Sequence, residues 1–230
     1  MRWFVAPATM ALAPGSHGYG LERMPAQGGV VLAANHLSVL DPPFIGTFSR
    51  RGICWMMKSE LLEIPVVGEA LTWTGAFPIR RGASDREGVR KARELVREGH
   101  VVGIFVEGTR QRLGYPGSIQ PGALIVAMRE HAPVVPCGVE SFGWSRRNRR
   151  ACAVVFGEPM RFDELPLNAK GYREAGERLR LEILRLWRQA AEAVASGFPE
   201  ELPDGTPRGD WIKPGEEIRV KTPRRVSGLA

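Results

Sequence analysis

The chain has 230 residues, a formal net charge of +7, and a composition that is 43% hydrophobic and 25% charged. A chain of this length and composition can bury one sizeable globular core, so a disordered or fibrous protein is excluded. The positive charge suits nucleic acid, anionic lipid or a phosphorylated substrate as a partner.

Residues 1–18 are expected to form an N-terminal tail without a membrane-spanning helix. The apolar stretch that begins at Trp3 is too short to span a bilayer, Pro7 interrupts it, and it lacks the basic start of a secretory signal. It could lie in a membrane interface with Trp3 and Phe4 as anchors, or it could be an ordinary first element of the fold. A short strand is expected next, at residues 19–22.

A buried strand is the first strong signal along the chain. Val30–Ala34 is an uninterrupted apolar run, which is typical of a strand covered on both faces. The run stops at Asn35 and His36. A few residues later, Asp41 followed by two prolines predicts a helix that Asp41 caps and that continues to about Ser49.

His36 and Asp41 allow two interpretations. His36 would lie at the carboxyl end of the strand, where open α/β sheets bind ligands. Asp41 could accept a hydrogen bond from one ring nitrogen and fix the tautomer, so that the other nitrogen is free to take a proton as a general base. Alternatively, His36 is a structural residue and Asp41 only a helix cap, and their spacing alone does not decide between the two.

The next two strands carry basic residues at their ends. Ile53–Met57 is apolar and continues into Lys58, and after a short amphipathic helix the strand at Gly75–Ile79 is followed by Arg80 and Arg81. Because neighbouring side chains of a strand point to opposite faces, one arginine can face a cleft while the other faces solvent. A solvated strand end is the alternative interpretation.

A further strand ends in a polar cluster. The clearest helix, at residues 84–99, leads into the apolar run Val101–Val106, which is followed by Glu107-Gly108-Thr109-Arg110. Gly108 permits close approach of the backbone, Thr109 offers a hydroxyl, and Arg110 presents a planar fork suited to phosphate oxygens. A turn with a surface arginine is the alternative.

The rest of the chain continues the alternation of helices and strands. We expect a helix at residues 123–129, strands at 132–139 and 152–156, and a long helix at 172–195. Residues 198–230 are rich in Pro, Gly and charge and are expected to form a loose C-terminal tail. The three cysteines show no metal-ligand spacing, so we expect buried free thiols in a reducing compartment and no metal site.

The alternation predicts an α/β fold, with a single domain at residues 19–197 whose largely parallel central sheet is flanked by helices. The carboxyl ends of parallel strands lie at one edge of a sheet. The polar clusters that follow Ala34, Ile79 and Val106 should therefore meet there, and that convergence is stronger evidence for a site than any single cluster.

Several blocks of the sequence resemble one enzyme family. The pattern Asn35-His36-x-Ser38-x-x-Asp41 is similar to the NHxSxxD signature of the glycerolipid acyltransferases, the group that includes 1-acylglycerol-3-phosphate acyltransferase. The second block, GAFPIRRG, ends like the family's second block in an arginine before glycine. The third, FVEGTR, matches FxEGTR, and the fourth is an apolar strand with a proline. From these blocks, which follow in the family's order, the chain is identified as a member of the glycerol-phosphate acyltransferase superfamily.

The resemblance implies roles for particular residues. His36 would be the general base and Asp41 its partner, with Asn35, Ser38, Arg80 and Pro136 in support. Arg80 departs from the family, because relatives often have an acid at that position. The acceptor phosphate would be bound by residues from three strand ends: Lys58, Arg81, Glu107, Gly108, Thr109 and Arg110. Of these, Glu107 would orient the cations or a glycerol hydroxyl.

The family's reaction moves a fatty acyl group from coenzyme A or acyl carrier protein to a hydroxyl of a glycerol-phosphate acceptor. The resemblance implies a lysophospholipid acceptor and an acyl-CoA or acyl carrier protein thioester as co-substrate, with no metal or redox cofactor. We further expect a cytoplasmic protein that associates peripherally with the anionic inner face of the cell membrane.

Other functions remain as alternatives. The acceptor could be glycerol 3-phosphate, a glycolipid or an aminolipid, or the chain could be a non-catalytic basic protein that binds lipid or nucleic acid. Nucleic acid is not expected, because the chain has no aromatic-interleaved basic strand and no recognised module. A hydrolase with a nucleophile elbow would need a GxSxG sequence, which is absent.

Overall fold

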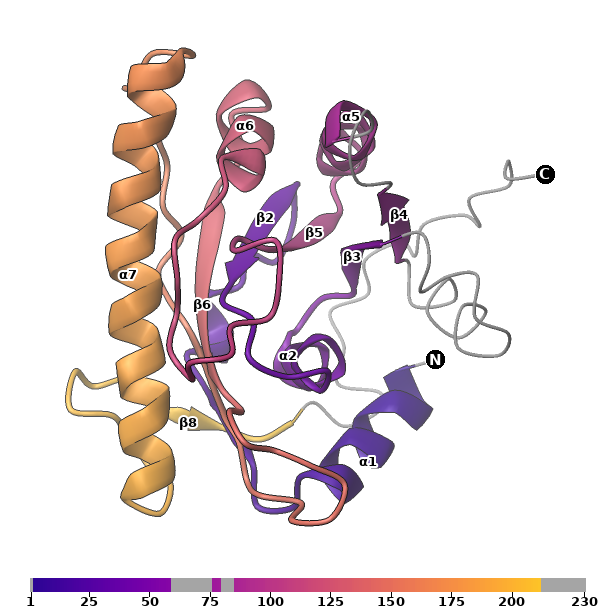
Figure 1. Ribbon diagram of the computed structural model, residues 1–230, viewed down its shortest axis with the longest axis vertical. Coiled ribbons are helices and arrows are strands. Elements are labelled where there is room, and N and C mark those ends of the chain that lie inside the picture. The colour runs from indigo at the N-terminus through magenta and orange to yellow at the C-terminus, as the bar shows by residue number, and fades with distance from the viewer. Residues whose placement is uncertain (1, 59–75, 80–84, 212–230) are drawn as a thin grey trace.

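A computed structural model describes residues 2–58, 76–79 and 85–211, and a single sheet runs through its centre (Figure 1). The strands lie in the order β4-β3-β5-β2-β6-β7-β1-β8. Their bounds are β1 His17–Tyr19, β2 Val30–Ala34, β3 Ile53–Lys58, β4 Phe77–Ile79, β5 Val101–Phe105, β6 Val134–Glu140, β7 Ala153–Phe156 and β8 Arg208–Gly209.

The five strands from β4 to β6 are parallel, whereas β7 is antiparallel to β6. At the far edge β1 runs parallel to β7, and β8 is antiparallel to β1. The described helices are α1 Arg2–Leu12, α2 Asp41–Phe48, α5 Asp85–Arg97, α6 Gly122–Arg129 and α7 Ala169–Ala195, together with the short 3₁₀ helix η1 Leu21–Arg23. The predicted α/β fold with a largely parallel sheet is confirmed.

Helices cover both faces of the sheet, which explains the uninterrupted apolar strands. Along β2, Val30, Leu32 and Ala34 pack on the same side as α2, whereas Val31 and Ala33 pack with α5, α6 and α7. The long helix α7 extends over β6 and β7 (Figure 1). The three cysteines are buried free thiols, as predicted. None of the described helices is long and apolar enough to cross a bilayer.

The N-terminal segment forms a regular first element. Helix α1 packs against α2, and Ala6, Thr9 and Ala13 are buried. The side chains of Trp3 and Phe4 lie outside the described part. The strand expected at 19–22 ends earlier, at Tyr19, because Gly20 takes a left-handed conformation with φ 67° and the 3₁₀ helix follows.

Pro136 lies inside β6. On the side of β7, Cys137 pairs with Phe156 and Val134 pairs with Met160. The chain that leaves β7 therefore has one more residue between these two pairs than β6 has. This is a bulge, a place where a sheet accepts proline. The carbonyl of Pro136 accepts the N–H of Gly157 across it.

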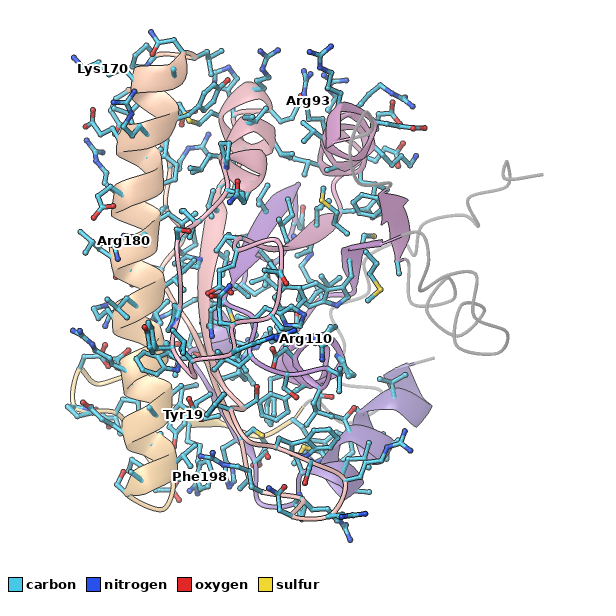
Figure 2. All side chains as sticks on the ribbon, viewed as in Figure 1. Tyr19, Arg93, Arg110, Lys170, Arg180 and Phe198 are labelled. Carbon is cyan, nitrogen blue, oxygen red and sulfur yellow. The ribbon has the colours of Figure 1, made fainter. Side chains whose placement is uncertain are left out.

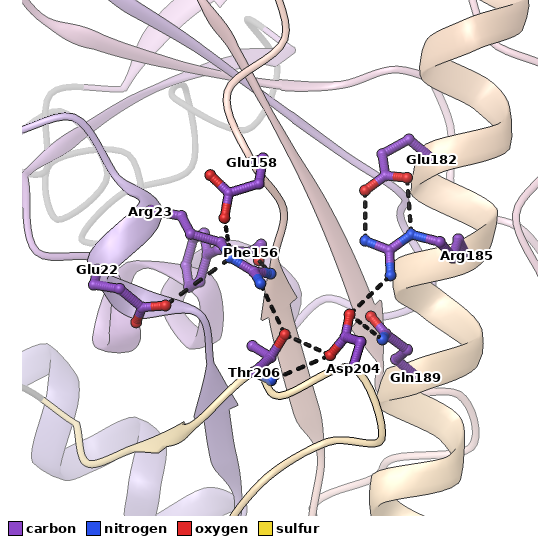
Figure 3. Close-up of polar contacts among 9 residues, drawn as sticks. All are labelled: Glu22, Arg23, Phe156, Glu158, Glu182, Arg185, Gln189, Asp204 and Thr206. Atoms are coloured by element: carbon purple, nitrogen blue, oxygen red, sulfur yellow. Dashed lines mark hydrogen bonds and ion pairs between the residues drawn. The ribbon is translucent and has the colours of Figure 1, made fainter.

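The segment after α7 differs from the loose tail that was expected, because residues 198–211 are tied to the domain (Figure 3). Asp204 accepts hydrogen bonds from Arg185, Gln189 and Thr206. Burial opposes ionisation of Asp204, yet these bonds lower its pKa well below the usual range. The side chain of Thr206 also accepts a bond from Arg23. Residues 212–230 lie outside the described part.

Candidate active site

The candidate site lies where the parallel strands end. β2 and β5 are neighbours, and the N–H of Val106 bonds to the carbonyl of Ala34 just beyond their last pair. Lys58 is the last residue of β3, so its backbone lies at the same edge, as predicted. The side chain of Lys58 and the whole of Arg80 and Arg81 lie outside the described part.

His36 and Asp41 form the predicted pair. The ring Nδ1 of His36 is 2.8 Å from Oδ2 of Asp41, and the side chains are 17% and 0% exposed, respectively. A carboxylate can only accept, so Nδ1 carries the proton of the neutral ring. The second nitrogen, Nε2, has no hydrogen bond to any described residue. The imidazole is therefore arranged as a base whose free nitrogen can accept a proton.

The predicted cap role of Asp41 is wrong. Leu40 occupies the N-cap position of α2 and makes no side-chain cap bond, while Asp41 is the first helical residue. Its carboxylate turns back toward the preceding loop, where Oδ2 accepts the N–H groups of Leu37 at 2.7 Å and Ser38 at 2.8 Å. The hydroxyl of Ser38 in turn accepts the N–H of Leu40. The buried charge thus shapes the loop that carries His36.

Ser141 was not among the predicted site residues. Its hydroxyl donates to Oδ1 of Asp41, and its side chain is fully buried. A sequence signal existed, because a polar residue directly follows the buried strand β6, which neighbours β2. The adjacent Glu140 accepts a bond from the indole N–H of Trp187 on α7, so the end of β6 is itself anchored.

Two residues hold the backbone of His36. Oε2 of Glu107 accepts the N–H of His36 at 2.7 Å, and Oε1 accepts the N–H of Gly117, also at 2.7 Å. Burial raises the pKa of Glu107 to about 7, although these two bonds oppose the rise. The carbonyl of His36 accepts the N–H of Gln111. Both carboxylate oxygens of Glu107 thus accept hydrogen bonds from backbone N–H groups.

Asn35 joins the site loop to β6. Its side-chain amide donates to the carbonyl of Val139 and accepts the N–H of the same residue. The pair of bonds continues the β2–β6 ladder past the end of β2, so that His36 emerges from a fixed position.

The EGTR segment forms the open side of the site. Gly108 has φ 70°, which favours glycine, and the nearest atom to an added Cβ would be 3.8 Å away, so the conformation rather than crowding requires it. Thr109 and Arg110 are exposed. Arg110 lies in the loop after β5, at the centre of the view in Figure 2, and forms no ion pair within the described part.

Comparisons with known proteins identify the family to which the chain is similar. A family model described as Acyltransferase matches residues 17–140. The 1-acyl-sn-glycerol-3-phosphate acyltransferase of Bacillus subtilis is 30% identical over 154 residues, which cover 66% of this chain and 76% of that protein. The chloroplastic enzyme of the same name from Brassica napus is 34% identical over 122 residues, 51% of this chain but only 35% of that protein.

A solved structure shares the fold. The crystal structure of the 1-acyl-sn-glycerophosphate acyltransferase from Thermotoga maritima superposes with a TM-score of 0.65 and 22% identity, covering 84% of this chain and 78% of that chain. At this level of identity, the likeness concerns the fold alone.

Proposed function

The chain belongs to the acyltransferase family, and we propose that it transfers a fatty acyl group to the free hydroxyl of 1-acyl-glycerol-3-phosphate in phospholipid biosynthesis. The similarity to 1-acyl-sn-glycerol-3-phosphate acyltransferases supports this acceptor. The observation that carries the proposal is the hydrogen bond between Nδ1 of His36 and the buried carboxylate of Asp41, with Nε2 unbonded to any residue that the structure describes.

The proposed step needs one base. Nε2 of His36 takes the proton of the acceptor hydroxyl while its oxygen attacks the carbonyl carbon of an acyl-CoA or acyl carrier protein thioester. The C–S bond then breaks, and the thiolate leaves with the proton that His36 returns. Asp41 stabilises the imidazolium formed in between, as the carboxylate does in hydrolase triads. A positioned base of this kind raises the reaction rate by about 10²- to 10⁴-fold. We propose that no cofactor beyond the thioester takes part.

We assign recognition of the acceptor phosphate to the EGTR loop. Arg110 is exposed beside the His36 loop, and its guanidinium can form two parallel bonds to a phosphate. Gly108 and Thr109 would supply backbone and hydroxyl groups. Lys58 and Arg81, whose side chains lie outside the described part, remain proposed members because they follow neighbouring strands.

The site's rim suits a membrane-embedded acceptor. Exposed large apolar side chains occur in the loops around His36: Val39, Leu113, Tyr115 and Phe142. Exposed arginines lie in the same or adjoining loops, among them Arg110, Arg112 and Arg146. We therefore propose peripheral association with the anionic inner face of the cell membrane, in the cytoplasm.

Vesicle flotation tests the membrane association. Binding to anionic vesicles that weakens at high salt would agree with it, because salt screens exposed charges. Equal binding to neutral and anionic vesicles would contradict the electrostatic part.

The reaction is tested with purified protein, acyl-CoA or acyl-loaded carrier protein, and a panel of acceptors read by mass spectrometry. The panel holds lysophosphatidate, glycerol 3-phosphate, a glycolipid and an aminolipid. We expect lysophosphatidate to be acylated best. His36→Ala should abolish transfer while circular dichroism shows an unchanged fold, and near-normal turnover in that variant would refute the assigned base.

A further inference from the structure

Three aromatic rings are stacked at the site. The centroids of the His36 and Phe105 rings are 4.0 Å apart with an interplanar angle of 19°. Phe105 in turn stacks on Trp55, with centroids 4.7 Å apart and an angle of 8°. We name these three residues the aromatic column. They come from the end of β2, from β5 and from β3, which lie in the order β3-β5-β2 in the sheet.

A glycine makes room for Trp55, which lies at the end of the column away from His36. Trp55 lies opposite Gly103 in the β3–β5 register, and a Cβ at Gly103 would come within 2.5 Å of Cε3 of the indole. The indole therefore lies directly on the β5 backbone, where any other residue would displace it. Phe105, two residues farther along β5, points to the same face and continues the stack. Trp55 is 4% exposed, so the column rests on a fixed core side chain.

The column and the hydrogen bonds act on different parts of the His36 ring. Asp41 bonds to Nδ1 at the ring's edge, whereas Phe105 covers a ring face. An edge bond alone permits the ring to tilt about the bond axis, and a stacked face removes that freedom. Together they fix the direction in which Nε2 points.

We propose that Phe105, supported by Trp55, is a positioning residue that orients the His36 ring and stabilises its protonated form. The face of an aromatic ring carries negative charge density, which attracts a cation stacked on it. In the proposed function, on which the catalytic part of this inference rests, the imidazolium exists only after proton transfer has begun. The attraction therefore acts more strongly in the transition state than on the bound substrate, and it raises kcat.

Other charged groups lie around His36, but none of the described ones shares the stacked face. Asp41 bonds to the ring edge, and Glu107 bonds to the backbone N–H. Arg110 lies in the exposed loop after Glu107, and Glu140 at the end of β6 is paired with Trp187. A change confined to Phe105 therefore leaves the bonds of these groups in place.

The first test replaces the aromatic face by an apolar side chain of similar size. In Phe105→Leu we expect kcat to fall by about 3- to 30-fold, the range of a desolvated cation–π contact. The NMR titration midpoint of the His36 ring should move to lower pH by about 0.5 to 1.5, because the charged form loses stabilisation. The chain has only four histidines, and the signal of His36 is identified by its loss in His36→Ala.

A matched control separates the column from general packing. Phe48 is fully buried in the same cluster as Trp55 but does not stack on His36. Phe48→Leu should lower the unfolding temperature and leave the His36 titration midpoint unchanged. A midpoint that moves equally in both variants, or in neither, would overturn the proposal.

Fluorinated phenylalanines at position 105 test the electrostatic part of the proposal, because they nearly keep the shape of the ring. They also provide a test if Phe105→Leu does not fold. Stepwise fluorination weakens the negative ring face, so kcat and the His36 midpoint should fall together with each added fluorine. Values that do not change along the series would show that Phe105 acts by packing alone. If no acceptor is acylated yet the midpoint moves as expected, the column stands and the proposed function fails.

Discussion

The two sides of the candidate site differ in how completely they are held. On the base side, the backbone of His36 is bonded at both its N–H and its carbonyl, and the carboxylate of Asp41 has four donors. On the recognition side, Thr109 and Arg110 are exposed, and Arg110 has no ion pair within the described part. The proposed base His36 is thus preorganised, whereas the exposed Arg110 is available to meet the proposed phosphate. Such a division suits catalysis, because a base must be aimed before the reaction, while an exposed cation gains its partner on binding.

Removing the charge on the base side should have the largest effect. In Asp41→Asn the side-chain oxygen can keep the Leu37 and Ser38 bonds while the amide faces Ser141, whose hydroxyl can also accept. The loop should therefore keep its shape, but the imidazolium loses its counter-charge. We expect kcat to fall by about 10²- to 10⁴-fold with a small change in unfolding temperature.

The control for this variant is the Michaelis constant for the acyl donor, which should stay nearly unchanged. An Asp41→Asn enzyme that retains most of its turnover would show that the carboxylate only shapes the loop. The rigid hold on His36 would then not explain catalysis.

On the recognition side, Arg110→Lys should keep the charge but lose the planar fork. We expect the Michaelis constant for lysophosphatidate to rise by about ten- to a hundredfold, because one of two charged hydrogen bonds is lost. The constant for acyl-CoA should change less. The matched control is Arg112→Lys, because Arg112 is an exposed arginine of the same loop, and this variant should change the constant for lysophosphatidate less. If acyl-CoA binding weakens instead, Arg110 belongs to the donor side.

Ser141→Ala tests whether the base side depends on the bond that sequence analysis missed. It leaves Oδ1 of Asp41 without its donor in a buried site, and a smaller loss of kcat is expected, about 3- to 10-fold. Ser141→Thr retains a hydroxyl and should restore most of the activity. Equal losses in both variants would indicate that packing, rather than the hydrogen bond, matters at this position.

The last expected effect concerns stability as a function of pH rather than activity. Burial raises the pKa of Glu107 from 4.5 to about 7. The folded protein therefore binds this proton more tightly than the unfolded chain, and stability attributable to Glu107 is fully present below pH 4.5 and lost as the pH rises through about 7. In Glu107→Gln the free energy of unfolding should depend less on pH between 4.5 and about 7, and the difference from wild type across this range should be on the order of 1 to 3 kcal/mol.

Urea unfolding at several pH values between 5 and 8, with wild type and variant in parallel, measures the difference. Parallel profiles would mean that the carboxylate of Glu107 titrates in its ordinary range and is more accessible to solvent than the structure indicates.

Much of the fold could be predicted because its signals are local. The apolar runs of β2, β3 and β5 identify buried strands by themselves, and the polar residues after them mark the sheet edge. The pairing of His36 with Asp41 was likewise accessible, since the two residues are five positions apart on one loop. The segment after α7 differs from the expected tail, because composition does not reveal that Asp204 bonds back to Arg185 on α7 or that Thr206 meets Arg23, 183 positions away.

The sequence by itself indicated the family, the order in which most strands and helices follow one another along the chain, and the residues proposed to carry acyl transfer, because each depends on short-range patterns of residue type. Only the tertiary structure decided how those residues are held. Asp41 turned out to bind the loop and Ser141, which is 100 positions away, rather than cap its helix. The stack of His36 on Phe105 and Trp55 exists because the sheet order sets β3, β5 and β2 side by side. Side chains distant in the chain become neighbours through strand order, which no local pattern specifies.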